Sequence, residues 1–263
     1  MGVGTNRINK YTLGKAAQGL SLFLKSKFTG DKIKVVIAYD CRYNNKLYSK
    51  IVSNILLAND IEVYLYSSLR TTPQLSYSVR HIKANCGIVL TASHNPSNYN
   101  GFKVYWKDGG QLTPPLDKEL MDTINSTNFK EILFEGTNQN LNIIDKKLDN
   151  AFIDTCIKLA KQDDIKSRDI KIIYTPIHGS SIVSIPKVLK RVGYKSLVIV
   201  DEQAKPDGAF PSVKSLNPEE PEALKMAIDI AKSAKCEVTG ITLSENQFKY
   251  CNEKAKEMNL ENQ

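Results

Sequence analysis

Three short runs of β-branched and aliphatic residues, separated by helix-length segments, constrain the fold of this chain more than any other feature. The runs have the length of buried strands and span residues 33–39, 61–66 and 86–92. The segments with apolar residues at helical spacing span 11–27, 45–58 and 73–84. This alternation is typical of a mostly parallel sheet covered by helices. The N-terminal half is therefore expected to form one α/β domain.

The same rhythm of strand and helix returns in the second half of the chain. Strands are expected at residues 169–175 and 195–201, and helices at 181–193 and 219–233. Between the halves, polar residues dominate from about 123 to 150, before a helix-like stretch at 151–161. We therefore expect two α/β domains of similar build, at residues 1–148 and 149–235. The halves share a pattern without visible sequence identity.

Composition narrows the classes of function. Apolar residues make up 41% of the 263 residues and charged residues 24%, an ordinary balance for a soluble globular protein. No apolar run has the length of a membrane span, and residues 1–15 lack an apolar signal core. A cytoplasmic protein without a membrane partner is therefore expected. Five widely spaced cysteines without a CxxC pair favour reduced thiols over disulfides or a zinc site.

The net charge of +8 is open to three interpretations. The lysines are spread along the chain at helical spacing, as in residues 187–191, which is typical of a solvated surface. A basic cleft for a phosphorylated sugar is a second interpretation. Nucleic-acid binding is the third, and no interleaving of aromatic and basic residues supports it. No nucleic-acid partner is therefore expected.

The segment richest in chemistry directly follows the third expected strand. It reads TASHNPSNYNGFK from Thr91 to Lys103. Ligands of open α/β sheets bind outside the carboxyl ends of the strands, so Ser93 is expected at a binding site. The Asn-Pro and Asn-Gly pairs predict turns that hold its hydroxyl in one orientation. Beside His94 as a base and Lys103 as a cation, Ser93 can pass or receive a phosphoryl group. On the residues alone, an ordinary turn with a capping serine is equally open.

The sequence TASHNP, followed by YNGFKVYWKDGGQ, closely resembles the phosphoserine loop of the α-D-phosphohexomutases, the phosphoglucomutases and phosphomannomutases. The resemblance implies two mixed, mainly parallel, three-layer α/β domains of the phosphohexomutase type. It implies that Ser93 carries a phosphate, donates it to a sugar phosphate, and takes one back from a hexose bisphosphate intermediate. His94 and Lys103 match residues that support this serine, and Thr91 and Asn95 are expected to bind substrate or phosphate. For Lys103, an acid/base or phosphate contact and a solvent-facing strand residue are both open.

Further segments carry the same resemblance. Residues 39–42 resemble a YDSR-type strand end, residues 174–179 resemble the YTPLHG turn that opens the second domain, and DGAFP and NPEEPEA match later segments. By this match Arg42 and His178 are candidate substrate- or phosphate-binding residues. A domain contact or a surface arginine remains open for Arg42. A structural turn histidine remains open for His178.

The resemblance also implies a Mg²⁺ cofactor, with the Ser93 phosphate as one of its ligands. The family's magnesium loop is a DxDxDR cluster, and carboxylate oxygens suit this hard cation. That cluster should follow the helix that ends near Ser233, yet no aspartate occurs from Ser233 to Gln263. A GTxGLRG-type segment ahead of Met1 and the third and fourth domains, which recognise the sugar, are likewise expected to be missing.

Residues 236–263 look foreign to this family. They predict a strand and then a helix capped by Ser244, with Gln247 completing a capping box. The stretch resembles part of the cyclopropane-fatty-acid synthases. The glycine-rich loop for S-adenosylmethionine is absent, so methyltransferase activity is not expected. We favour a join of two unrelated gene fragments, and a diverged strand and helix of the second domain is the alternative.

Two functions follow from this sequence. The first is an intramolecular phosphotransferase that interconverts hexose 1-phosphate and hexose 6-phosphate, with glucose preferred over mannose, through a phosphoserine at Ser93. The second is a truncated, non-catalytic remnant of such an enzyme, which folds but lacks the metal loop and the sugar-binding domains. Turnover of glucose 1-phosphate, and its loss on Ser93→Ala, would separate the two.

Overall fold

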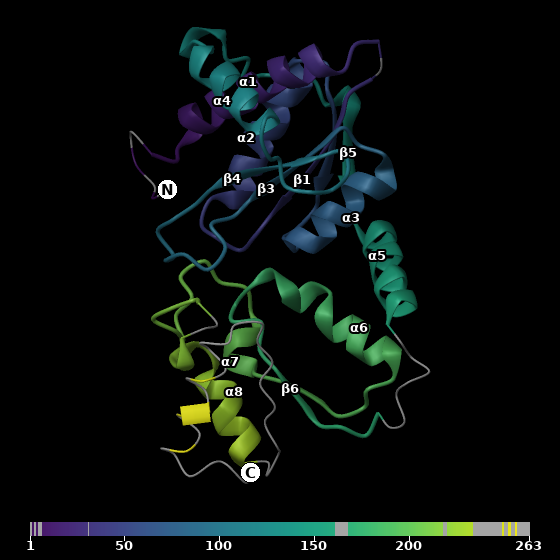
Figure 1. Ribbon diagram of the computed structural model, residues 1–263, viewed down its shortest axis with the longest axis vertical. Helices are drawn as coiled ribbons and strands as arrows, with labels where there is room; N and C mark the ends of the chain where they lie inside the picture. The colour runs from purple at the N-terminus through teal and green to yellow at the C-terminus, as the bar shows by residue number, and fades with distance from the viewer. Residues whose placement is uncertain are drawn as a thin grey trace.

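The chain folds into two α/β domains, as the alternation of strands and helices predicted. The computed structural model describes residues 2, 4, 7–30, 32–160, 168–217, 220–233, 249, 252–253 and 256. Figure 1 traces the first domain from purple to teal, down to helix α5, and the second domain from green to yellow. No helix in these described ranges is long and apolar enough to cross a bilayer.

The first domain is built on a five-stranded sheet with the order β4-β3-β1-β2-β5. Its elements are α1 (Lys10–Lys27), β1 (Lys34–Tyr39), α2 (Asn45–Ala58), β2 (Glu62–Tyr66), α3 (Thr72–Ile82), β3 (Cys86–Leu90), β4 (Phe102–Trp106), α4 (Leu116–Ser126), the 3₁₀ turns η1 (Phe129–Glu131) and η2 (Asn138–Asn140), β5 (Leu141–Ile144) and α5 (Lys146–Leu159). β1 pairs in parallel with β2 and β3, β5 adds in parallel to β2, and β4 is antiparallel to β3. The sheet is therefore mixed and mainly parallel, as expected.

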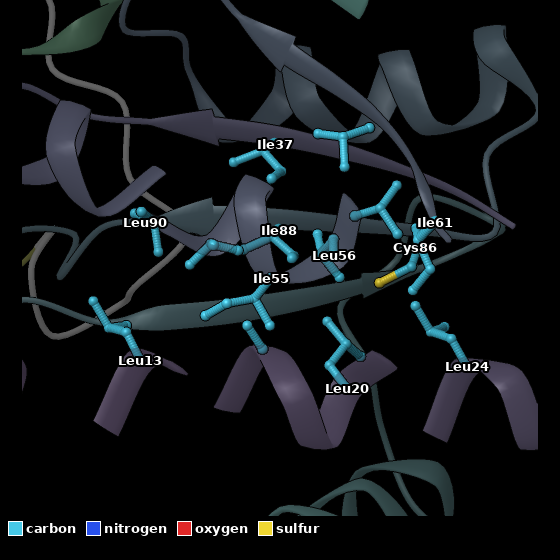
Figure 2. Close-up of a cluster of buried hydrophobic side chains, with 14 of the residues drawn as sticks. Leu13, Leu20, Leu24, Ile37, Ile55, Leu56, Ile61, Cys86, Ile88 and Leu90 are labelled. Atoms are coloured by element: carbon cyan, nitrogen blue, oxygen red, sulfur yellow. The ribbon is translucent and has the colours of Figure 1, made fainter. Parts of the chain in front are cut away.

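Alternate residues of the central strand face two separate cores, which makes the domain three-layered. Val35 and Ile37 of β1 pack on the side of α1 and α2, and Val36 and Ala38 pack on the side of α3. Figure 2 shows the larger core, where side chains of α1 such as Leu20 meet those of α2 and the strands. Burial on both faces explains why these strands are continuous apolar runs in the sequence.

Helix α3 begins at the edge where the strands end. Thr71 precedes it in extended conformation, and Pro73 occupies its first turn. Proline is tolerated there because the N–H groups of the first turn have no partner within the helix. The helix ends at Lys83, whose φ of 55° is left-handed. This start brings residues 70–73 beside the carboxyl ends of β1 and β3.

One helix and one strand of the first domain, α4 and β5, were not predicted, nor were the two short 3₁₀ turns between them. The stretch from about 123 to 150 was interpreted as polar, but it contains β5, and α4 begins shortly before it. β5 is a four-residue edge strand in which Ile143 is 57% exposed, so its pattern is too short and too polar to stand out. The helix expected at 151–161 begins earlier, at Lys146.

The second domain is described more partially. It contains β6 (Ile172–Tyr174), η4 (Ser180–Val183), α6 (Ile185–Val192), β7 (Leu197–Ile199), α7 (Asp201–Ala204) and α8 (Pro221–Ser233). β6 and β7 pair in parallel, α6 packs against β7, and α8 packs against β6. Each expected strand and helix is present, although both strands are shorter than predicted. The 3₁₀ turn η4 that precedes α6 and the short helix α7, which begins at the end of the predicted strand 195–201, were not expected. The strand and helix predicted for residues 236–263 lie almost wholly outside the described residues.

Candidate functional site

Ser93 lies in the exposed loop that follows β3, with a left-handed backbone. Its φ is 57°, a conformation that costs a residue with a Cβ about 1–2 kcal/mol. The backbone N–H of Ser93 donates to Thr91 Oγ1 at 2.9 Å, and the N–H of Asn95 donates to the carbonyl of Ala92 at 3.1 Å. The serine is therefore turned out of the sheet by a locally hydrogen-bonded turn and exposed to solvent.

The buried side chain of Arg42 holds this loop by hydrogen bonds to its backbone. Its Nη1 donates to the carbonyls of Pro96 at 2.7 Å and Tyr99 at 2.9 Å. Its Nη2 donates to the carbonyls of Ser93 at 3.0 Å and Asn95 at 2.6 Å. The residue is 3% exposed, so these four charge-assisted bonds are shielded from water. Arg42 thus fixes the shape of the Ser93 loop, with both terminal nitrogens committed to it.

Asp40 joins Arg42 and Thr91 into one network at the end of β1. Its Oδ2 accepts from Thr91 Oγ1 at 2.6 Å and lies 3.3 Å from Arg42 Nε, and its Oδ1 accepts from the N–H of Arg42 and from Asn45 Nδ2. Burial raises the pKa of the Asp40 carboxyl above its ordinary value, and the hydrogen bond from Thr91 is the largest effect that lowers it. The carboxyl is therefore a structural acceptor.

The base of the loop is closed by buried amides and one glycine. Asn45 Nδ2 donates to the carbonyl of Leu90 at 3.0 Å, and Asn100 Nδ2 donates to Asn45 Oδ1 at 2.6 Å. A Cβ on Gly101 would lie 2.6 Å from the carbonyl oxygen of Thr91, so only glycine fits there. The Asn-Gly pair that predicted a turn is thus also a packing requirement.

The other predicted residues of this segment are His94, Asn95 and Lys103. His94 and Asn95 are exposed, and Asn95 Nδ2 donates to the carbonyl of Ala92 at 2.9 Å. Lys103 is on β4, directly opposite Val89 of β3, and is half-buried. Opposed residues of an antiparallel pair share one face, so Lys103 leaves the sheet on the same face as Val89. Within the described residues, no hydrogen bond or ion pair engages its ammonium group.

A cleft of ≈ 260 Å³ opens beside this loop, between the two domains. Its lining comes from the ends of β1 and β3, the start of α3, and two turns of the second domain. The lining residues are Asp40, Cys41, Arg70, Thr71, Thr72, Pro73, Val89, Thr91, Ser93, Gly179, Ser180, Ser181 and Phe210. Ser93 thus lines a cleft at the strand ends, where the parallel sheet predicted a site.

His178 is in the second domain and is only 3% exposed. Its Nδ1 lies 3.0 Å from the carbonyl oxygen of Lys205, and its Nε2 lies 2.9 Å from Ser212 Oγ. Both ring nitrogens therefore have protein partners, and His178 does not line the cleft, although Gly179 does. The structure brings Arg42, Thr91, Ser93 and Asn95 into one bonded unit and leaves His178 outside it.

Several residues of the site were not singled out from the sequence. Asp40 was available by its position at the end of β1, one of the strands whose carboxyl ends define the site. Cys41 lines the cleft, and burial raises the pKa of its thiol to about 12. Phe210 lies in the DGAFP segment that matches the family, but neither it nor the residues at the start of α3 could be assigned to the cleft, which they reach only through the tertiary fold.

The described residues do not offer a magnesium site of the expected kind. No group of three His, Cys, Asp or Glu side chains in the described ranges is arranged to hold a metal ion. Asp40, the carboxylate of the lining, is already engaged by Thr91, Asn45 and Arg42. The donor set around Ser93 therefore does not fit Mg²⁺, which needs several oxygen ligands.

Two family models match this chain. The model described as phosphoglucomutase/phosphomannomutase, alpha/beta/alpha domain I, matches residues 1–131. The model for alpha/beta/alpha domain II of the same proteins matches residues 150–242. Residues 236–242 of the segment that looked foreign therefore fall inside the second match.

Curated relatives give the same result. A phosphoglucomutase of Staphylococcus haemolyticus is 39% identical over 235 residues, and one of Staphylococcus saprophyticus is 36% identical over 236 residues. In both cases the match covers 88% of this chain and 42% of the relative. The chain thus spans less than half the length of these relatives.

Solved structures confirm the fold. A putative phosphomannomutase from Thermus thermophilus has a TM-score of 0.75 at 23% identity, covering 86% of this chain and 48% of that one. A phosphoglucomutase/phosphomannomutase family protein from Burkholderia thailandensis has a TM-score of 0.70 at 20% identity, covering 90% of this chain and 49% of that one.

Proposed function

The chain belongs to the phosphoglucomutase/phosphomannomutase family, and on this premise we propose that Ser93 is its phosphate-carrying serine. The proposed reaction interconverts hexose 1-phosphate and hexose 6-phosphate, with a hexose bisphosphate as intermediate. The observation that carries the proposal is the backbone of Ser93, which is left-handed, exposed and held by a hydrogen-bonded loop that lines the cleft between the domains. Strain kept at one exposed nucleophile is typical of a functional residue.

In the proposed cycle, the bond between Ser93 Oγ and phosphorus breaks while an oxygen of the sugar phosphate forms a new bond to phosphorus. The proton of the attacking hydroxyl leaves to a base, and the oxygen of Ser93 regains a proton. The bisphosphate then returns its other phosphoryl group to Ser93 by the reverse step. Positioning and charge stabilisation dominate such a transfer.

We assign supporting roles to the neighbouring side chains. The ammonium of Lys103 is a contact for the phosphoryl group or its acid/base, which its lack of an intramolecular partner in the described residues supports. His94 and Asn95 flank the phosphate on the exposed loop. For Arg42 and His178 we propose structural roles, because both terminal nitrogens of Arg42 and both ring nitrogens of His178 already have protein partners.

For the sugar, we propose glucose, because the curated relatives bear the name phosphoglucomutase. Mannose is the other hexose that the family names include. The lining of the cleft includes the hydroxyl-bearing residues Thr71, Thr72, Ser180 and Ser181, a residue type that suits a hydroxylated ligand.

A second candidate is a folded protein that accepts a phosphoryl group on Ser93 without completing the cycle. The donor set around Ser93 favours it, since the described residues do not fit the Mg²⁺ that the family resemblance implies. In this case the loop is competent and turnover is absent.

One experiment separates these outcomes. The purified chain is incubated with glucose 1-phosphate, glucose 1,6-bisphosphate and Mg²⁺, and both product and intact protein mass are followed. Turnover lost in Ser93→Ala would support the full reaction. A phosphoryl group on Ser93 without turnover would support the second candidate. A wild-type chain that acquires no phosphoryl group would refute Ser93 as the carrier.

A further inference from the structure

The second domain makes a close backbone contact with the residues on either side of Arg42, the side chain that holds the Ser93 loop. A Cβ on Gly208 would lie 2.8 Å from the carbonyl oxygen of Cys41 and 2.8 Å from the backbone nitrogen of Tyr43. The Cys41 thiol also donates to the carbonyl of Asp207, with 3.7 Å between sulfur and oxygen. The backbone of turn 207–210 is therefore seated directly on both neighbours of Arg42, at a distance that only glycine permits.

The same turn places an aromatic ring on Arg42 itself. Phe210 is 7% exposed and has a left-handed φ of 52°, an uncommon conformation for a phenylalanine. Its ring centroid lies 5.4 Å from the guanidinium carbon of Arg42, within the range of a cation–π contact. The terminal N–H groups of the guanidinium donate to the four loop carbonyls, and the Phe210 ring is a further neighbour of the same group.

We infer that turn 207–210 of the second domain positions the Ser93 loop through Arg42. The ring of Phe210 excludes water from the guanidinium, and hydrogen bonds are stronger in a less polar environment. One side chain, Arg42, thus contacts both the second domain and four carbonyls of the loop. Docking of the turn and order of the loop are coupled, and either one weakens when the other is lost.

The coupling is tested by a substitution in the second domain that leaves the sequence of the first domain unaltered. Gly208→Ala introduces a methyl group into the 2.8 Å contacts without demanding an unusual φ. Gly110→Ala is the matched control, because a Cβ there meets only the flexible side chain of Asp108, at 3.3 Å or more. Hydrogen–deuterium exchange of the peptide covering residues 93–99 is the readout, with the peptides of β1 and β3 as internal reference.

In Gly208→Ala we expect exchange of the loop peptide to accelerate about tenfold, which corresponds to about 1.4 kcal/mol. The β1 and β3 peptides and the Gly110→Ala variant should exchange as the wild type does. Unchanged loop exchange in a folded Gly208→Ala variant would overturn the inference.

A second pair of variants addresses the ring and does not depend on the substitution at Gly208. Phe210→Ala should accelerate loop exchange, and Phe210→Tyr should restore wild-type exchange because it keeps an aromatic face over the guanidinium. If the alanine variant protects the loop as well as the wild type, Phe210 has no positioning role and the inference fails.

The consequence for chemistry rests on the proposed function. Uptake of a phosphoryl group by Ser93 from glucose 1,6-bisphosphate, followed by intact mass, should be about tenfold slower in Gly208→Ala at saturating bisphosphate. Equal uptake in the two proteins would remove the functional part of the inference. If the wild type takes up no phosphoryl group, the proposed function fails, and the exchange experiments still decide whether the turn positions the loop.

Discussion

Replacing Arg42 by lysine tests the account of the serine loop most directly. Lysine keeps the positive charge but has three donors on one nitrogen, whereas Arg42 reaches four carbonyls from two nitrogens and faces Asp40 with a third. Loss of about two hydrogen bonds from a charged donor costs about 3–6 kcal/mol, and a buried carboxylate left poorly paired costs a similar amount. Since these losses overlap, we expect about 3–5 kcal/mol in total.

The assay is thermal and urea unfolding of Arg42→Lys beside Arg191→Lys. Arg191 forms an exposed ion pair with Asp154, so its replacement should change stability by less than about 0.5 kcal/mol. For a unit of roughly 150 residues, the loss at Arg42 corresponds to a fall in Tm of about 6–20 °C. The reasoning is refuted if Arg42→Lys unfolds within about 1 kcal/mol of the wild type, because the four carbonyl contacts would then contribute little.

Three further predictions concern other parts of the structure. Ser93→Gly should be more stable than Ser93→Ala by about 1 kcal/mol in thermal unfolding, because φ is positive there; equal stabilities would contradict the strain. Cys41, with a thiol pKa of about 12, should react with iodoacetamide at pH 8 about 10²-fold more slowly than an ordinary cysteine, since its far smaller thiolate fraction outweighs its greater nucleophilicity. Its rate should keep rising tenfold per pH unit up to pH 10, whereas a plateau near pH 9, read by peptide mass spectrometry, would count against the raised pKa. Leu20→Ala should lose about 2–5 kcal/mol of stability and Leu22→Ala, whose side chain is 42% exposed, far less; similar losses would show that the α1 face is misassigned.

The sequence predicted those parts of the fold in which apolar residues recur regularly along a strand or helix. β1, β2 and β3 are apolar on both faces and were found directly. β5 was missed because Asn142 interrupts a four-residue edge strand, and pairing with β2 rather than local composition makes it a strand. Short edge strands lack the periodicity on which sequence interpretation depends.

The candidate site divides in the same way. The turn chemistry of residues 95–101 is local, so the loop could be predicted around Ser93. The partners of Arg42 and His178 lie 51–57 and 27–34 residues away along the chain, respectively. Their roles were left open because a single sequence does not say which carbonyl a distant side chain reaches. The contact of Phe210 with Arg42 joins two domains and has no local signature at all.

The origin of the loop's bonds bears on what this chain can do by itself. The hydrogen bonds by which Arg42, Thr91 and Asn45 hold the Ser93 loop and its base, and the bridge that pairs Gly2 with Tyr99 of that loop, all lie within the first domain. The second domain adds the contact of turn 207–210 to Arg42. Neither contribution requires the further length that the curated relatives possess. Under the proposed function, acceptance of a phosphoryl group by Ser93 and reorientation of a sugar bisphosphate are separable demands, and these contacts bear on the first. A phosphorylated Ser93 in a chain that turns nothing over is consequently a result that this structure would explain, whereas turnover without phosphorylation of Ser93 is one that it would not.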